Sequence, residues 1–312
     1  MHDIAIIRHN AERFDLEMQR RGTDACSETI LALDEKKRSI VTKLQEKQGE
    51  RNKVSKDIGV RKREGTDSID LIQQVAAIKS EIQNLEEQER NLVSELNSLL
   101  SELPNILSDE VPDGLTEKEN LEIRRHGTLP NFEFRAKDHV ELGEALNGLD
   151  FNSAAKISGS RFVFLKSNLA RLERALTNFM LDHQVQKFGY TEISPPLMVN
   201  EKALFGTGQL PKFSDQQFKT TDDYWLIPTS EVPLTNLVAD SIVDEAALPL
   251  RYTAYTPCFR SEAGAAGRDT KGMIRVHQFG KVEMVSIAHP GQSIKEHERM
   301  TECAEDILSI LN

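Results

Sequence analysis

Residues 257–284 read PCFRSEAGAAGRDTKGMIRVHQFGKVEM, and this stretch decides the fold class of the chain. Apolar and polar residues alternate through 251–262 and again through 274–287, on either side of the glycine-rich loop AGAAGRDTKG. Such alternation around a short loop predicts two antiparallel strands. Further strands are expected near 161–165, in YTEISPP and at 225–227, and helices near 136–148 and 169–187, the last ended by Gly189. This mixture predicts an α+β domain built on an antiparallel sheet.

The predicted strand 274–287 has two chemically different faces. One face carries Ile274, Val276, Val282 and Met284, and the other carries Arg275, His277, Phe279, Lys281 and Glu283. The partner strand is expected to point Cys258, Arg260 and Glu262 to a single side. A solvated sheet face would also be charged, and that interpretation stays open. However, Phe279 could stack on a flat base, Arg260 could hold a phosphate through two hydrogen bonds, and Glu283 could hold an ammonium group. The pattern therefore indicates a site for a nucleotide and an amino acid.

A different periodicity occupies the N-terminal third of the chain. A heptad seam runs through Leu71, Val75, Ile78, Ile82, Leu85, Leu92, Leu96, Leu99 and Leu103. A weaker seam precedes it, and Gly59, Gly65 and a polar segment separate the two. The sequence therefore predicts an antiparallel coiled-coil arm with helices at about 27–58 and 70–103, each roughly 50 Å long at about 1.5 Å per residue.

Charge is divided unevenly between the two predicted arm helices. Residues 27–65 carry 11 Lys and Arg against 7 Asp and Glu, a net charge of +4, whereas residues 66–103 carry 2 against 8, a net charge of -6. These charges could simply solvate the coiled coil and pair across it. Alternatively, the first helix could follow a phosphate backbone. The residues in question are Lys36, Lys37, Arg38, Lys43, Lys53, Lys56, Arg61, Lys62 and Arg63.

Composition excludes several classes of function. The net charge of -11 means that any nucleic-acid surface must be a local patch. Cys26, Cys258 and Cys303 lie far apart, which argues against a disulfide framework and a thiolate zinc site and favours the cytoplasm. No signal peptide, membrane span, P-loop or dinucleotide fingerprint is expected. A polar stretch with Pro104, Pro112 and Gly114 predicts a boundary near residue 110. Residues 1–110 would form the arm domain and 111–312 the second domain.

Several strings resemble one enzyme family, the seryl-tRNA synthetases of bacterial type among the class II aminoacyl-tRNA synthetases. They include FRSEAG, GRDTKG, RVHQFGKVEM and TSEVPLTN around the predicted site, AAKISGSRFVFLK, LARLERAL and FGYTEISPPLMV before it, and MHDIAIIRHN, LDEKKRSI and ERNKVSKDIG in the first 60 residues. The resemblance covers essentially the whole chain. It implies a serine–tRNA ligase with a tRNA-binding arm and a class II catalytic domain.

The resemblance also implies roles for individual residues. Thr229, Ser230 and Glu231 would line the serine pocket, and Glu283 would take the serine ammonium group. The ATP contacts would come from Arg260, Ser261, Glu262 and Phe279, with catalytic Arg260 on the α-phosphate and Phe279 on adenine. Contacts to tRNA would come from Lys36, Arg38, Lys43, Lys53, Lys56, Arg61, Lys62 and Arg63 on the arm and from Arg268, Lys271 and Arg275 at the loop.

The family resemblance further implies the reaction and its partners. The serine carboxylate would attack the α-phosphorus of ATP, and the resulting seryl-adenylate would acylate tRNA(Ser), and also tRNA(Sec). Magnesium would accompany ATP, although no metal ligand is assigned within the chain. YTEISPP, at residues 190–196, would lie at the interface of a homodimer.

Other interpretations remain open from the residues alone. Thr229 and Glu231 follow Pro228 and could merely cap a helix and supply its first-turn acid. The chain could also be a ligase with another acceptor, or a catalytically inert relative that binds RNA or a protein partner. Finally, the chain ends at Asn312, before the family's third signature motif would be expected, which predicts an incomplete adenylation site and an inactive fragment.

Overall fold

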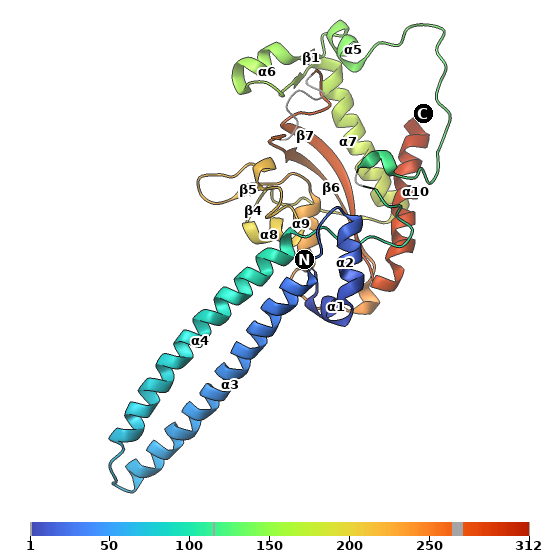
Figure 1. Ribbon diagram of the computed structural model, residues 1–312. Coiled ribbons are helices and arrows are strands. Elements are labelled where there is room, and N and C mark those ends of the chain that lie inside the picture. Colours follow the sequence, from blue (N-terminus) through green and yellow to red (C-terminus); the bar gives the residue numbers. More distant parts are fainter. Residues whose placement is uncertain (1, 115, 264–270, 312) are drawn as a thin grey trace. The chain divides into compact units, whose positions relative to one another are not determined.

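The computed structural model describes residues 2–114, 116–263 and 271–311, and it divides the chain into two compact units, residues 1–124 and 125–312 (Figure 1). The first unit contains α1 (Ile4–His9), α2 (Ala11–Arg20), α3 (Ser27–Arg63) and α4 (Ile69–Glu102). A short 3-10 turn at Glu117–Glu119 completes it. None of the described helices is long and apolar enough to cross a membrane.

Helices α3 and α4 form the predicted antiparallel arm (Figure 1). Its outer part is held together by Leu44 and Val54 of α3 packed on Ile78 and Ile82 of α4. Its base is a second apolar cluster, to which α1 and α2 contribute Ile7, Phe14 and Met18, α3 contributes Ile30 and Leu33, and α4 contributes Leu96 and Leu100. Three of the heptad residues, Ile78, Ile82 and Leu96, are buried and the others partly buried, because each helix covers the apolar stripe of the other.

The first arm helix is longer than predicted. We expected it to end near residue 58, before Gly59, but α3 continues to Arg63. No heavy atom lies within 4 Å of the position that a β-carbon on Gly59 would take. A single glycine inside a helix costs only about 1 kcal/mol relative to alanine. The chain instead reverses at Gly65, whose φ of +71° lies in the left-handed region that favours glycine.

An ion pair between exposed Arg8 and buried Asp34 ties α1 to the base of the arm. Arg8 donates from Nε and Nη2 to the two carboxylate oxygens of Asp34, at 2.8 and 2.7 Å. Asp34 is 1% exposed, and Arg38 adds a weaker contact at 3.5 Å. The hydrogen bond from Arg8 lowers the pKa of Asp34, despite an opposing effect of burial.

We expect Asp34→Asn to lower the melting temperature of the arm's transition by about 5 °C at neutral pH, because the amide cannot pair with both nitrogens of Arg8 as an anion does. The depressed pKa means that the carboxylate stabilises the fold above the pKa of the unfolded chain, about 3.9, and that this contribution is lost as pH falls through the folded pKa. Wild type and variant should therefore converge in strong acid. Circular dichroism as a function of pH measures this, with the exposed Asp24→Asn as control; a gap that does not narrow in acid contradicts it.

The second unit is built on a three-stranded sheet in the order β3-β6-β7. β6 (Leu250–Phe259) and β7 (Gln278–Ile287) are antiparallel, whereas β3 (Thr191–Glu192) joins β6 in parallel. α7 (Ser167–Phe188) packs against β6 and β7 and also contacts α10 (Ser293–Leu311). α7 ends where predicted, because Gly189 adopts a left-handed conformation with φ 68°.

Short elements surround this sheet. β1 (Leu149–Asp150) pairs with β2 (Phe164–Leu165), and β4 (Met198–Val199) pairs with β5 (Trp225–Leu226). The short helices are α5 (His139–Ala145), α6 (Phe151–Ser158), α8 (Glu201–Gly206) and α9 (Glu231–Thr235), with 3-10 turns at Ser214–Gln216, Asn236–Val238, Glu245–Ala247 and Pro290–Gln292. An apolar cluster containing Leu204, Trp225 and Val232 packs α8, β5 and α9 together.

The central hairpin is shorter than its alternation predicted. Strands were expected over 251–262 and 274–287, but the ladder ends at the pair Phe259 and Gln278. Beyond it, the His277 N–H donates to Arg161, outside the hairpin, and Glu262 has a φ of +52°. Ile274, expected on a core face, is 66% exposed. The single-sided placement of Cys258, Arg260 and Glu262 along one strand is therefore wrong, because Arg260 and Glu262 both lie beyond the end of β6 at Phe259.

Candidate active site

One face of the β6–β7 hairpin forms the floor of the site. The register pairs Ala254 with Glu283, Thr256 with Lys281 and Cys258 with Phe279. Alternate residues of a strand point to the same side of the sheet, so Phe279, Lys281 and Glu283 share a face, as the alternation of this segment predicted. Their directly paired partners on β6 point to that side as well. Along β6 the facing positions Ala254, Thr256 and Cys258 are small and buried.

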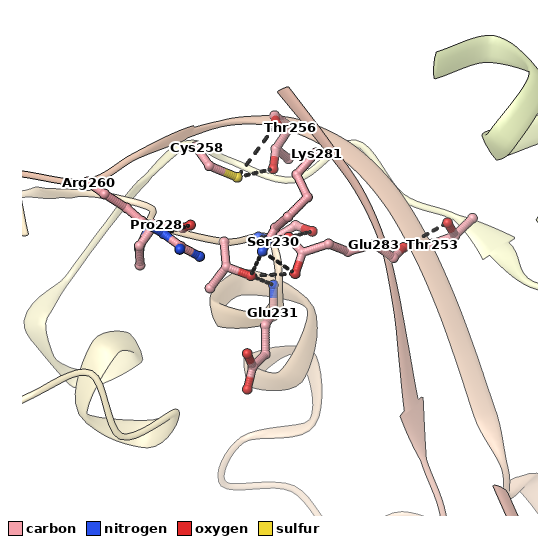
Figure 2. A network of polar contacts seen from close by, with 10 residues as sticks. Pro228, Ser230, Glu231, Thr253, Thr256, Cys258, Arg260, Lys281 and Glu283 are labelled. Carbon is pink, nitrogen blue, oxygen red and sulfur yellow. Dashed lines mark hydrogen bonds and ion pairs between the residues drawn. The ribbon is translucent and has the colours of Figure 1, made fainter. Parts of the chain in front are cut away.

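The start of α9 lies above this floor, and its residues converge on Glu283 (Figure 2). The Thr229 hydroxyl donates to Oε1 of Glu283 at 2.5 Å, and Lys281 Nζ lies 3.0 Å from the same oxygen. The backbone N–H and hydroxyl of Ser230 donate to Oε2 at 2.6 and 2.8 Å. A carboxylate that is 15% exposed therefore receives four donors.

These contacts determine the charge of Glu283. Burial on its own would raise the pKa of this carboxyl group, but the hydrogen bonds from Thr229, Ser230 and Lys281 outweigh it, and the pKa is lowered. Glu283 is consequently an anion at neutral pH. An ionised carboxylate fixed at the start of a helix is suited to holding a cationic group of a ligand.

A cavity of about 350 Å³ opens beside this group. Its lining includes the polar and charged side chains of Thr229, Glu231, Arg260, Glu262, Arg275 and Lys281, together with Gln209, Phe213, Gln216, Gln217 and Pro228. The Arg260 guanidinium stands 5.2 Å from the centre of the Phe279 ring, and its Nε lies 3.4 Å from the carbonyl oxygen of Pro228. The structure thus brings a carboxylate, a guanidinium and an aromatic ring close together.

The other predicted ATP contacts are held by protein partners. The Ser261 hydroxyl donates to the carbonyl oxygen of Asp215 at 2.5 Å, and its N–H donates to Gln216 at 3.0 Å. Arg275 pairs with Glu262 at 3.3 Å and lines the cavity, although the resemblance implied a tRNA contact for it. These contacts fix the backbone beyond β6 close to Arg260.

Phe279 borders a second cavity, of about 490 Å³, rather than the first. This second cavity is also lined by Tyr255 and Gly280. A β-carbon on Gly280 would lie 2.8 Å from the Tyr255 ring, so only glycine lets the Tyr255 side chain lie against this position of β7. The predicted stacking of Phe279 on adenine therefore stays a prediction.

Two interpretations of Thr229 and Glu231 were open, and the structure contains features of both. Thr229 Oγ accepts the N–H of Glu231, the first residue and first-turn acid of α9, at 3.3 Å, while it also donates to Glu283. The carboxylate of Glu231 is turned away from Glu283 in Figure 2, but it still lines the cavity. Glu231 therefore does not join the group that surrounds Glu283.

The loop predicted to meet tRNA is anchored at its C-terminal base. Lys271 pairs with Asp138 at 3.2 Å, and the Met273 N–H donates to Nε2 of His139 at 3.0 Å. A β-carbon on Gly272, where φ is +83°, would lie 2.1 Å from that nitrogen. The start of α5 thus holds residues 271–273 tightly. Arg268 lies outside the described residues.

The predicted tRNA-binding residues of the arm all lie on α3. Within the described residues, Arg38 pairs with Asp34 and Arg61 with Asp70, whereas Lys36, Lys43, Lys53, Lys56 and Lys62 form no ion pair and are exposed. Arg63 is also exposed and donates to the carbonyl oxygen of Gly59. One basic residue in the seam, Lys47, does pair across the arm, with Glu81 at 2.8 Å. The structure therefore pairs some of the arm's charges within the arm, and contact of the exposed lysines with tRNA stays a prediction.

Sequence reasoning did not assign functions to Lys281, Asp138 or His139. Lys281 could have been singled out, because it lies two residues from both Phe279 and Glu283 on the same strand face. Asp138 and His139 carry no such signal, since their partners are more than 130 residues away. Among the described residues, no group of three His, Cys, Asp or Glu side chains could hold a metal ion.

Family models match two parts of the chain. Residues 1–107 match the seryl-tRNA synthetase N-terminal domain, and residues 212–312 match the class II tRNA synthetase core domain (G, H, P, S and T). The serine–tRNA ligase of Paramagnetospirillum magneticum is 55% identical over 311 residues, which is 100% of this chain and 74% of that protein. The ligase of Rhodospirillum centenum is 56% identical over 100% of this chain and 73% of its own length.

Solved structures of the same family resemble the chain over almost its whole length. The seryl-tRNA synthetase of Pyrococcus horikoshii complexed with ATP has a TM-score of 0.86 and 36% identity, covering 99% of this chain and 74% of that one. The cytoplasmic serine–tRNA ligase of Naegleria fowleri in complex with AMP has a TM-score of 0.80 and 28% identity, covering 97% and 71%. This chain belongs to the seryl-tRNA synthetase family, the serine–tRNA ligases with a class II core and an N-terminal helical arm.

Proposed function

We propose that this protein activates L-serine with ATP and transfers it to the 3′ end of tRNA(Ser). The observation that carries the proposal is the ionised carboxylate of Glu283, held by Thr229, Ser230 and Lys281 beside a cavity of about 350 Å³ that also contains Arg260. Glu283 would bind the serine ammonium group, and the Thr229 hydroxyl next to it would help to orient the amino acid.

Positioning and charge neutralisation would carry the rate of activation. The serine carboxylate attacks the α-phosphorus of ATP in line with the departing pyrophosphate, and no covalent enzyme intermediate is needed. Arg260 would hold the α-phosphate and stabilise the charge that develops on it. Phe279 would support the adenine ring, and Ser261 and Glu262 would complete the ATP site.

Magnesium fits this cavity as a companion of ATP. Mg²⁺ commonly uses one or two carboxylates together with substrate phosphates and water. Glu231 and Glu262 both line the cavity and could supply such carboxylates. The ion would neutralise phosphate charge and help to orient the triphosphate.

The exposed lysines of α3 would form the surface for the body of the tRNA. Lys36, Lys43, Lys53, Lys56 and Lys62 point to solvent without a carboxylate partner among the described residues, which suits contacts with phosphates. Arg38, Arg61 and Arg63 would add to this surface, and Lys271 would act near the 3′ end. The same surface would accept tRNA(Sec), because phosphate contacts carry little sequence information.

Two further properties belong to the proposal. The protein would form a homodimer through the YTEISPP segment, since β3 is an edge strand whose residues Thr191 and Glu192 are both exposed. It would work in the cytoplasm, where the free thiols of Cys26, Cys258 and Cys303 remain reduced.

Binding of L-serine and of tRNA(Ser) to the same preparation tests this function. We expect the triple charge reversal of Lys53, Lys56 and Lys62 to glutamate to weaken tRNA binding by roughly 100-fold and to flatten its dependence on salt, because fewer counterions are released. Serine binding, measured by calorimetry, should not change. The matched control reverses Lys79 and Arg90, which are exposed on α4. A wild-type chain that binds neither serine nor tRNA contradicts the proposed function.

A further inference from the structure

We propose that Lys281 occupies the place of the substrate ammonium group in the serine-free site, and that serine binds by exchange with it. This inference rests on the proposed function, because it assumes that Glu283 and Thr229 receive the serine ammonium. It adds a residue that determines which amines the site accepts.

The ammonium group of Lys281 contacts both oxygens that are proposed to bind the serine ammonium. Lys281 Nζ lies 3.0 Å from Oε1 of Glu283 and 3.0 Å from the hydroxyl oxygen of Thr229. An ammonium group that binds both of these oxygens from the side of the cavity that Lys281 lines would stand close to that nitrogen. Lys281 itself carries an ammonium group, so the substrate and the side chain have the same charge and the same donor geometry.

The carboxylate has no place for a fifth donor. An ionised carboxylate offers about four lone-pair positions. Thr229 and Lys281 take those of Oε1, while the N–H and hydroxyl of Ser230 take those of Oε2. A new ammonium group can therefore bind directly only after one of the four donors has left.

Of these donors, Lys281 is the one that can leave at small cost. Ser230 is fully buried at the start of α9, and Thr229 is 5% exposed and accepts the N–H of Glu231, the first residue of that helix. Moving either would disturb the helix start. The side chain of Lys281 is 30% exposed, has a flexible stem and lines the open cavity.

The released lysine has a partner only if the ligand is an amino acid. The carboxylate of an α-amino acid is attached to the carbon that carries its ammonium group, so it enters the same cavity. Nζ of Lys281, displaced by a few ångströms, can pair with that carboxylate. An amine without a carboxylate would displace the lysine and leave it without a new partner, and its binding should be penalised.

The test compares L-serine with ethanolamine, which has the same amine and hydroxyl but no carboxylate. We expect Lys281→Met to tighten ethanolamine binding by about tenfold, because no ion pair has to be broken, and to change serine binding by less than about threefold, because the loss of the carboxylate contact offsets that gain. Calorimetry on the chain measures both affinities. Lys219→Met is the matched control, since Lys219 pairs with exposed Asp223 and does not line the cavity.

Two results would overturn the exchange. One is an ethanolamine affinity that Lys281→Met leaves unchanged or weakens, and the other is a change of the same factor for both ligands. If wild type binds serine and Glu283→Gln abolishes serine binding, either result rejects the exchange of Lys281 but leaves the proposed function intact. If wild type binds no serine at all, both fail together.

A second measurement follows Lys281 in wild type and uses a variant that keeps the charge, Lys281→Arg, only to assign the signal. Lysines labelled with ¹³C at Cε report on their ammonium groups, and the spectrum of Lys281→Arg identifies the signal that belongs to Lys281. Saturating serine should shift this signal and leave that of Lys219 in place. An unmoved Lys281 signal in the presence of bound serine overturns the inference.

Discussion

Glu283→Gln is expected to weaken L-serine binding by roughly 100- to 1,000-fold, the loss that follows when one member of a buried, hydrogen-bonded charge pair is removed. Glutamine has nearly the same shape, but its amide nitrogen is a donor and would face other donors. Thr229, Ser230 and Lys281 all donate to the carboxylate in the present structure. Calorimetric titration with L-serine measures the change.

Binding of tRNA(Ser) should be nearly unaffected by Glu283→Gln, because the proposed tRNA contacts come from α3 and Lys271 and do not include Glu283. Glu245→Gln is a suitable control, since the side chain of Glu245 is 83% exposed. A Glu283 variant that loses serine and tRNA binding together would show that this residue supports folding rather than serine recognition. Unchanged serine affinity would remove Glu283 from the proposed site altogether.

Arg260→Ala is expected to weaken ATP binding by about 100-fold, because a planar guanidinium holds a phosphate through two charged hydrogen bonds. Arg260→Lys keeps the charge but loses the paired geometry, and about a tenfold loss is expected for it. Titration with a non-hydrolysable ATP analogue measures both variants without any turnover.

Two further measurements make the Arg260 experiment specific. Arg135→Ala is the control, because the side chain of Arg135 is 87% exposed and pairs only weakly with Glu141 at 3.5 Å. L-serine binding to Arg260→Ala in the absence of nucleotide should change little, since Arg260 forms no hydrogen bond with Glu283 among the described residues. Equal losses for serine and ATP would indicate a collapsed cavity instead of a missing phosphate contact.

Much of the fold follows from local patterns that the sequence displays directly. The heptad seam predicted the two-helix arm, and the burial of Leu44, Val54, Ile78 and Ile82 reflects that seam. Gly189 predicted the end of α7 because only a left-handed residue closes the helix there. The alternation in 278–287 predicted the shared face of Phe279, Lys281 and Glu283. Each of these predictions depends on residues close together in the chain.

Predictions failed where a distant segment competes with the local pattern. Alternation continued to residue 262 and began at 274, but the backbone of Arg161 takes the His277 N–H, and the hairpin ladder stops at Phe259. Gly59 was expected to end the first arm helix, yet packing against α4 carries α3 past it. In both cases a tertiary contact outweighed a local preference of about 1 kcal/mol.

The sequence by itself determined the family, the arm and the residue types of the site, because these depend on composition, periodicity and long matching strings. Only the tertiary structure decided what Glu283 contacts. Thr229 and Ser230 precede it by 54 and 53 residues, and the fold brings the start of α9 onto β7 so that the donors surround one carboxylate. Lys281 became a candidate for exchange with the substrate for the same reason, since the contact of its ammonium group with Thr229 exists only after the two segments have packed together.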